Sequence, residues 1–175
     1  MSVRPLLFLI GGRGTGKTTV ARLLAHQLGW EWVDADEALE LRHGQSIRAI
    51  FAAEGEAGFR DKEAAVLEEL CRSARLVVAT GGGVVLREAN RKRLRVTGRV
   101  VWLTADAQTI WGRLQRDPVT AERRPALTVG GLAEIKELLR AREPLYRGAA
   151  DFTVSTSGRT PEEVADAVQQ SLNLG

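Results

Sequence analysis

One short segment limits the possible folds more than any other: the apolar run 6–10, which GGRGTGKTT follows at once. The run has no polar residue, which is typical of a strand buried on both faces. Residues 11–18 fit the pattern G-x-x-x-x-G-K-T, and a helical pattern begins near Lys17. The sequence therefore predicts a strand, a phosphate-binding loop and a helix in direct succession.

The composition of this loop indicates anion binding. Glycines let consecutive backbone N–H groups point into one concavity, and the start of a helix adds partial positive charge. Lys17 would reach the outer phosphates, and the Thr18 hydroxyl would bind Mg²⁺. The alternative is a glycine-rich turn with an incidental lysine. The residues that we expect to contact the nucleotide are Gly12, Arg13, Gly14, Thr15, Gly16, Lys17, Thr18 and Thr19.

Strand and helix patterns alternate along the rest of the chain. Further strands are expected at 30–33, 76–79, 99–103 and 152–154, with helical patterns between them. This alternation predicts an α/β fold whose parallel sheet has helices on both faces and binds ligands at the carboxyl ends of its strands. The length of 175 residues suits a single domain spanning 1–175.

Composition excludes several kinds of protein. Cys71 is the only cysteine, so the chain can form no intrachain disulfide and no cysteine-based metal cluster. No apolar run approaches the roughly 20 residues that span a bilayer. The formal net charge is +3, but the basic residues are dispersed and only 5% of residues are aromatic, which disfavours nucleic-acid binding. We expect a cytoplasmic monomer without a membrane or nucleic-acid partner.

Two groups of residues follow the second and third expected strands, where open α/β sheets form a crevice. Asp34 and Asp36 form the sequence DAD, and Gly81 to Gly83 form a triple glycine. One carboxylate could hold Mg²⁺ through water, and the other could orient or deprotonate an attacking hydroxyl. The glycines would let the backbone approach a ligand closely. The alternatives are that Asp34 only caps the next helix and that the glycines form a plain turn.

Two arginines could clamp an acidic substrate, because arginine makes bidentate contacts with carboxylates. Arg60 lies in GEAGFR and Arg142 in REPLYR. The alternative for Arg60 is an i,i+4 pair with Glu56 on a helix surface. The alternative for Arg142 is a position one turn before the end of its helix, where a cation suits the helix dipole.

The alternation breaks at 116–131, a segment with two prolines, two glycines and three arginines. A loop this long inside a compact domain is usually functional or disordered. We interpret it as a lid whose Arg124 would approach the phosphates, stabilise the transferring charge and help to exclude water. The alternative is a solvated loop.

Six segments, in this order, resemble the shikimate kinase family: GGRGTGKTT, DAD, GEAGFR, TGGG, RRPAL and REPLYR. Many families share the first segment, whereas the combination of the other five is specific. The resemblance implies a three-layer, nucleoside-monophosphate-kinase-like P-loop fold with a five-stranded parallel sheet, a lid, and a substrate-binding helical region at about 34–62. It also implies transfer of the ATP γ-phosphate to the 3-hydroxyl of shikimate, a step in aromatic amino acid biosynthesis.

The resemblance also implies roles for individual residues. Lys17, Asp36 and Arg124 would be catalytic, with Asp36 on the substrate hydroxyl, and Thr18 with Asp34 would serve Mg²⁺. The substrate carboxylate and ring would contact Arg60, Arg142, Gly81, Gly82 and Gly83, and adenine would lie near Arg113 and Arg159.

Three other functions stay open from the residues alone: a kinase of another small hydroxy acid such as gluconate, a nucleoside monophosphate kinase, and a catalytically silent nucleotide-binding regulator. The first shares the phosphate loop, so GEAGFR and REPLYR are the discriminating features. The second needs a base-recognition site that the sequence does not offer. The third lacks support because Lys17, Thr18, Asp36 and Arg124 are all present.

Overall fold

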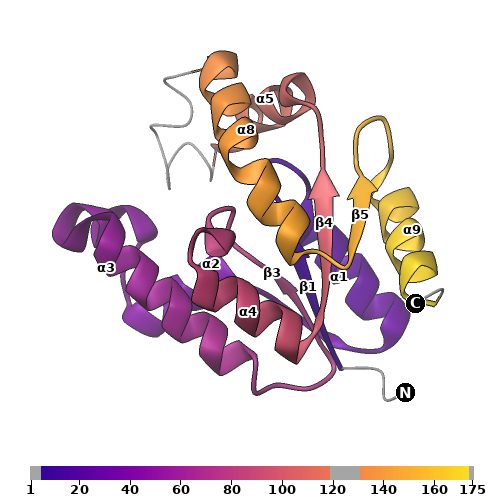
Figure 1. Ribbon diagram of the computed structural model, residues 1–175, viewed down its shortest axis with the longest axis horizontal. Coiled ribbons are helices and arrows are strands. Elements are labelled where there is room, and N and C mark those ends of the chain that lie inside the picture. The colour runs from indigo at the N-terminus through magenta and orange to yellow at the C-terminus, as the bar shows by residue number, and fades with distance from the viewer. Residues whose placement is uncertain (1–4, 119–130, 174–175) are drawn as a thin grey trace.

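Five parallel strands form one sheet in the order β2-β3-β1-β4-β5 (Figure 1). The computed structural model describes residues 5–118 and 131–173. All five residues of β1 are buried, as their apolar character predicts, and this strand occupies the centre of the sheet. The strands are β1 (Leu6–Ile10), β2 (Glu31–Asp34), β3 (Leu76–Ala79), β4 (Arg99–Thr104) and β5 (Phe152–Ser155).

Helices cover both faces of the sheet and complete the expected three layers. They are α1 (Lys17–Leu28), α2 (Ala35–His43), α3 (Ile47–Leu70), α4 (Glu88–Thr97), α5 (Ala107–Gln115), α8 (Gly131–Ala149) and α9 (Pro161–Asn173), with a short 3₁₀ helix at Val84–Leu86. Side chains of β1 alternate between the two faces. Leu7 and Leu9 pack in the core beneath α1 and α9, whereas Phe8 and Ile10 pack in the core beneath α4 and α8.

Two helices differ in detail from the sequence expectation. The sequence predicts a helix that is capped by Ser46 and ends near Gly55; instead, the helix bends at Gly55, with φ 71° and ψ −173°, and continues to Leu70 as part of α3. Phe51 and Phe59 stack across the bend with ring centroids 4.7 Å apart. In α8, the helix continues through Pro144 to Ala149. Arg142 therefore lies well inside its helix, and the placement of this arginine one turn before a helix end is wrong.

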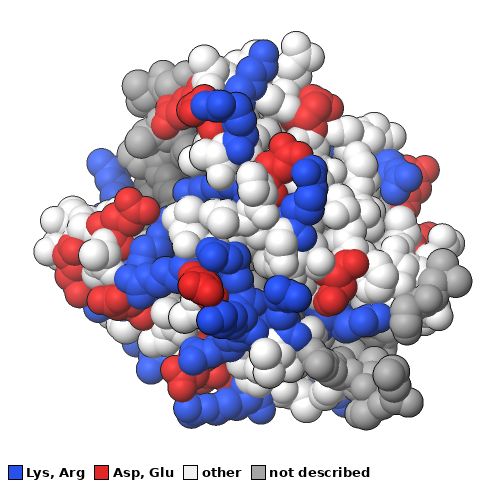
Figure 2. Space-filling view, in the orientation of Figure 1, with Lys and Arg blue, Asp and Glu red and all other residues white. Residues whose placement is uncertain are grey.

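The basic residues near α4 form ion pairs rather than a uniform positive surface. Figure 2 shows Lys and Arg side chains gathered over the face where α4 lies, with acidic side chains among them. Lys92 pairs with Glu88 at 3.1 Å, and Arg93 pairs with Glu68 at 3.2 Å. These contacts agree with a solvated charged face. Within residues 5–118 and 131–173, no helix is both long and apolar enough to cross a membrane.

Candidate active site

The phosphate loop is held in shape by its own lysine and threonine. Lys17 begins α1, and its Nζ donates hydrogen bonds of 2.8 Å to the carbonyl oxygens of Gly11 and Gly12. The Thr15 hydroxyl also donates to the Gly12 carbonyl, at 2.8 Å. Both side chains are buried. The ammonium is therefore fixed over the loop, next to the backbone N–H groups that begin the helix.

Asp34 has two functions, one for each carboxylate oxygen. As the N-cap of α2, it accepts hydrogen bonds through Oδ1 from the backbone N–H groups of Asp36 (2.9 Å) and Glu37 (3.1 Å). Its Oδ2 accepts a hydrogen bond of 2.7 Å from the Thr18 hydroxyl. The helix-capping alternative is therefore correct for Oδ1, but it does not explain the contact of Oδ2 with Thr18.

The pair Thr18 and Asp34 has the composition of a magnesium site. A hydroxyl and a carboxylate oxygen lie together at the start of α1, beside the loop that would hold phosphates. In the described part of the chain, no cluster of three or more His, Cys, Asp or Glu residues could hold a metal. Mg²⁺ is usually bound through one or two protein oxygens, substrate phosphates and water, so these two donors fit its requirements.

A cavity of about 240 Å³ joins the phosphate loop, the DAD segment and the triple glycine. These three segments follow β1, β2 and β3, which are neighbours in the sheet, so their side chains meet at one edge as the topology predicts. The residues that line the cavity are Arg13, Gly14, Gly16, Lys17, Thr18, Thr19, Asp34, Asp36, Thr80, Gly81, Gly82 and Asp117.

The triple glycine leaves room for functional side chains to approach the backbone. A Cβ atom at Gly81 would lie 2.8 Å from Oδ1 of Asp36, and one at Gly83 would collide with the Arg60 guanidinium. At Gly82, the position of a Cβ atom lies 3.6 Å from Nη1 of Arg142. Asp36, Arg60 and Arg142 thus converge on this loop, and a side chain at Gly81 or Gly83 would displace Asp36 or Arg60.

Arg60 is not the surface residue of the alternative interpretation. Its exposed fraction is 6%, and its Nη1 contacts Glu63 at 2.8 Å, while the contact with Glu56 is longer at 3.5 Å. Glu63 is also buried. Sequence reasoning missed Glu63, although its i+3 spacing from Arg60 was visible in GEAGFRDKE.

Tyr146 is a second residue that sequence reasoning missed. Its hydroxyl donates a 2.5 Å hydrogen bond to the Gly82 carbonyl, and its ring stacks on Trp102 with centroids 5.7 Å apart. The side chain is buried. The only available signal was its position one turn after Arg142 in REPLYR. Tyr146 therefore connects α8 directly to the triple glycine.

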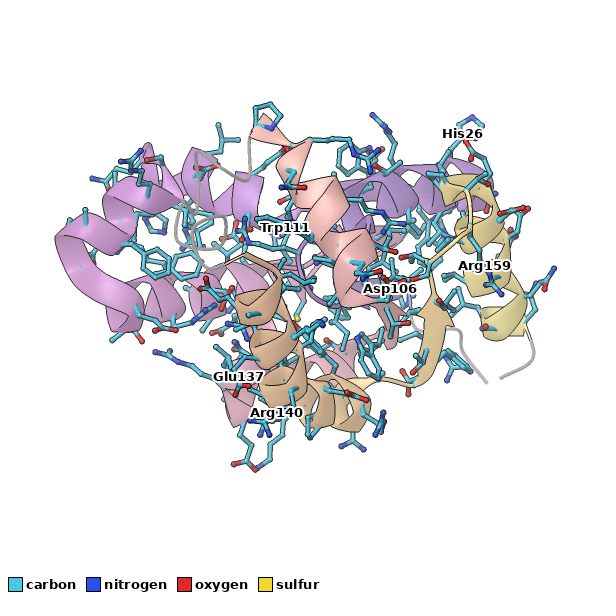
Figure 3. The ribbon with its side chains drawn as sticks, turned by 90° about the horizontal axis from the view of Figure 1, so that it is seen from above. His26, Asp106, Trp111, Glu137, Arg140 and Arg159 are labelled. Atoms are coloured by element: carbon cyan, nitrogen blue, oxygen red, sulfur yellow. The ribbon has the colours of Figure 1, made fainter. Side chains whose placement is uncertain are left out.

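Arg113 connects the phosphate loop to the segment after β5. It donates to the Gly14 carbonyl at 2.9 Å and to the hydroxyl and carbonyl oxygens of Thr156 at 3.1 and 3.2 Å. Arg159 is exposed in the same segment, just before α9. Figure 3 shows Arg159 on the α9 side of α5 and Trp111 on the opposite side, toward α8. In the strand order, the triple glycine follows β3 on one side of β1, whereas Arg113 and Arg159 follow β4 and β5 on the other side.

Asp106 fixes the start of α5 near this segment. It accepts hydrogen bonds from the Thr109 backbone and hydroxyl, both at 2.8 Å, and from the Ser157 hydroxyl at 2.9 Å. These bonds, those from Thr109 first, lower the pKa of the Asp106 carboxyl to about 2 because they favour its ionised form. Arg124 and residues 119–130 of the expected lid lie outside the described residues.

Comparisons with known proteins identify close relatives of this chain. The family model described as shikimate kinase matches residues 13–173. A shikimate kinase of Rhodopirellula baltica is 45% identical over 163 residues, which cover 93% of this chain and 87% of the relative. A solved structure of shikimate kinase from Acinetobacter baumannii, in complex with shikimate, matches with a TM-score of 0.91 and 38% identity. It covers 97% of this chain, and the match spans 93% of that chain.

A gluconokinase structure bears on one of the alternatives. The enzyme from Sinorhizobium meliloti is 17% identical, with a TM-score of 0.59, and the match covers 99% of this chain and 94% of that chain. A likeness at this level shows a common fold and does not favour gluconate as the substrate.

Proposed function

The chain belongs to the shikimate kinase family, and from this membership we propose that it transfers the γ-phosphate of ATP to the 3-hydroxyl of shikimate. The product would be shikimate 3-phosphate, an intermediate of aromatic amino acid biosynthesis. The observation that carries the proposal is the convergence of Asp36, Arg60 and Arg142 on the triple glycine, beside the phosphate loop. One carboxylate and two guanidinium groups complement an acceptor that carries hydroxyls and a carboxylate.

On the nucleotide side, we assign binding of the triphosphate to the backbone of Gly12 to Gly16, with Lys17 on the transferring phosphate. Thr18 and Asp34 would hold Mg²⁺, which neutralises charge on the phosphates when it is bound. The contact of Arg113 with the Gly14 carbonyl supports a place for the adenine beside Arg113 and Arg159. The role of Arg124 stays a prediction from the sequence.

On the acceptor side, we assign the substrate carboxylate to Arg60 and Arg142 and the ring to Gly81, Gly82 and Gly83. Asp36 would accept the hydrogen bond of the reacting hydroxyl and orient it toward the phosphate. Exclusion of water matters because water competes with the hydroxyl for the phosphoryl group. Since phosphoryl transfer depends mainly on positioning and electrostatic stabilisation, orientation by Asp36 is its principal contribution.

Coupled release of ADP tests this proposal most directly. The purified chain would be assayed with Mg·ATP and, in parallel, shikimate, gluconate, a nucleoside monophosphate or no acceptor. We expect turnover with shikimate alone, and mass spectrometry should identify the phosphorylated product. Turnover with a different acceptor would support the assignment as a kinase but refute shikimate as its substrate. Absence of turnover with every acceptor would leave the silent regulator as the better interpretation.

We also propose that the chain acts as a monomer in the cytoplasm. The single cysteine suits a reducing compartment. Light scattering of the purified protein at assay concentration should give a mass close to 19.1 kDa. A mass twice as large would contradict the monomer without affecting the proposed reaction.

A further inference from the structure

Arg13 carries a side chain that the phosphate-loop pattern does not require. The pattern binds phosphates through backbone N–H groups, the lysine and the following hydroxyl. Its four variable positions are filled here by Gly12, Arg13, Gly14 and Thr15, and only one of these four has a long, charged side chain. A role in nucleotide binding through the backbone therefore leaves the guanidinium of Arg13 unexplained.

The guanidinium of Arg13 extends toward the acceptor side of the cavity. Its Nη2 lies 3.6 Å from Oδ2 of Asp36, and each side chain is 14% exposed. Both residues line the same cavity as Gly81 and Gly82. The backbone nitrogen of Arg13 also lies 3.7 Å from the position that a Cβ atom would take at Gly82. Arg13 is thus at the boundary between the phosphate loop and the triple glycine.

The two oxygens of the Asp36 carboxylate face different groups. Oδ2 faces Arg13, whereas Oδ1 faces the triple glycine, 2.8 Å from the Cβ position of Gly81. A contact of 3.6 Å is an ion pair rather than a hydrogen bond, so its strength is mainly electrostatic and tolerates small movements. The ion pair therefore favours the orientation of the carboxylate in which Oδ1 faces the triple glycine, where an acceptor hydroxyl would lie.

We propose that Arg13 is a positioning residue for the phosphate acceptor. It acts through Asp36, whose carboxylate it orients before the acceptor binds. This inference rests on the proposed function, because it takes Asp36 as the group that binds the reacting hydroxyl. A preoriented carboxylate loses less conformational freedom when the acceptor arrives, so the ion pair strengthens acceptor binding and aligns the hydroxyl for attack. The phosphate loop thus contributes to recognition of both substrates.

Steady-state kinetics of Arg13→Met would test the proposal. Methionine keeps most of the length of the side chain and removes its charge. We expect KM for shikimate to rise about 10-fold and kcat to fall, since a contact to a charged group is lost. KM for ATP and the affinity for ADP, measured by calorimetry, should change by less than about two-fold. Arg13→Lys should recover part of the loss.

A matched control and a double variant make the test specific. Arg72→Met removes an exposed arginine that pairs with Glu68 on the surface, and it should match the wild type. In an Asp36→Asn background, Arg13→Met should add little further loss in shikimate affinity, because the partner of the ion pair has already changed. Calorimetric titration with shikimate gives this affinity without requiring turnover.

Three outcomes would overturn the inference. Equal losses in ADP and shikimate affinity would assign the guanidinium to the nucleotide, and unchanged kinetics would leave it with no role in the acceptor site. Additive effects of Arg13→Met and Asp36→Asn would show that Arg13 does not act through Asp36. If the wild type phosphorylates a different acceptor, the proposed function fails, and the same comparison with that acceptor tests Arg13 separately.

Discussion

The phosphate loop and the proposed acceptor site lie at the same edge of the sheet, but they are built differently. The loop is formed by contiguous residues, and its internal hydrogen bonds join residues three to six positions apart, such as Thr15 and Gly12 or Lys17 and Gly11. The acceptor site is assembled from α2, α3, α8 and the triple glycine, with a hydrogen bond between residues 64 positions apart. The loop is therefore a local property of the sequence, whereas the acceptor site depends on the completed fold.

The largest effect is expected from a substitution in the phosphate loop, which is the locally built part of the site. Lys17→Ala removes the ammonium that Gly11 and Gly12 hold over the phosphate loop. Turnover should fall by roughly a thousandfold or more, because the transferring phosphate loses its charge stabilisation. The coupled assay measures this loss, and circular dichroism should show that the fold is retained. Turnover close to that of the wild type would refute the assignment of the phosphate loop.

The two acceptor arginines should separate binding from stability. Arg60→Ala should raise KM for shikimate about 100-fold and also destabilise the fold by about 3 kcal/mol, since Glu63 would stay buried without this cation. Arg142→Ala should raise KM for shikimate with a smaller change in stability, because Arg142 is only half-buried. Kinetics and urea denaturation measure the two effects. Equal effects of Arg60→Ala on KM for ATP and for shikimate would contradict the carboxylate clamp.

A smaller effect is expected from Tyr146→Phe, which removes one hydroxyl and retains the ring against Trp102. The Gly82 carbonyl would lose its hydrogen bond, and the buried oxygen would cost about 1–3 kcal/mol of stability. We expect kcat/KM for shikimate to fall by about 10-fold while ADP affinity stays unchanged. If calorimetry showed that ADP binding weakens as much as shikimate binding, the assignment of Tyr146 to the acceptor site alone would be refuted.

The smallest effect concerns Asp106, on the nucleotide side. Its pKa in the fold, about 2, lies below the ordinary aspartate value of 3.8, so its hydrogen bonds stabilise the fold above pH 3.8 and are lost as pH falls through about 2. Wild type and Asp106→Asn should therefore differ modestly in stability at pH 7 and converge between about pH 4 and pH 2. Urea denaturation across this range measures the difference in stability between the two proteins. A difference that increased as the pH fell would contradict the lowered pKa of Asp106.

The same contrast explains what the sequence could and could not reveal. The sheet, its central strand and the phosphate loop follow from apolar runs and one contiguous pattern. The predicted placement of Arg142 near the end of its helix was wrong, because proline usually ends a helix but does not do so here. In α8, burial of Tyr146 and Ala149 against the sheet favours continuation through Pro144. The contact of Tyr146 with Gly82 joins distant segments, and no local pattern reports such a contact.

The bend at Gly55 makes the length of the following segment as important as its residues. Arg60 lies five positions beyond the bend, on the helical part of α3 that ends at Leu70. Each residue added to a helix turns everything after it by about 100°. One insertion or deletion between the bend and Arg60 would rotate the guanidinium away from Gly83 without altering any side chain. This stretch should therefore resist any change in its number of residues, even one that leaves Phe59 and Arg60 themselves unaltered.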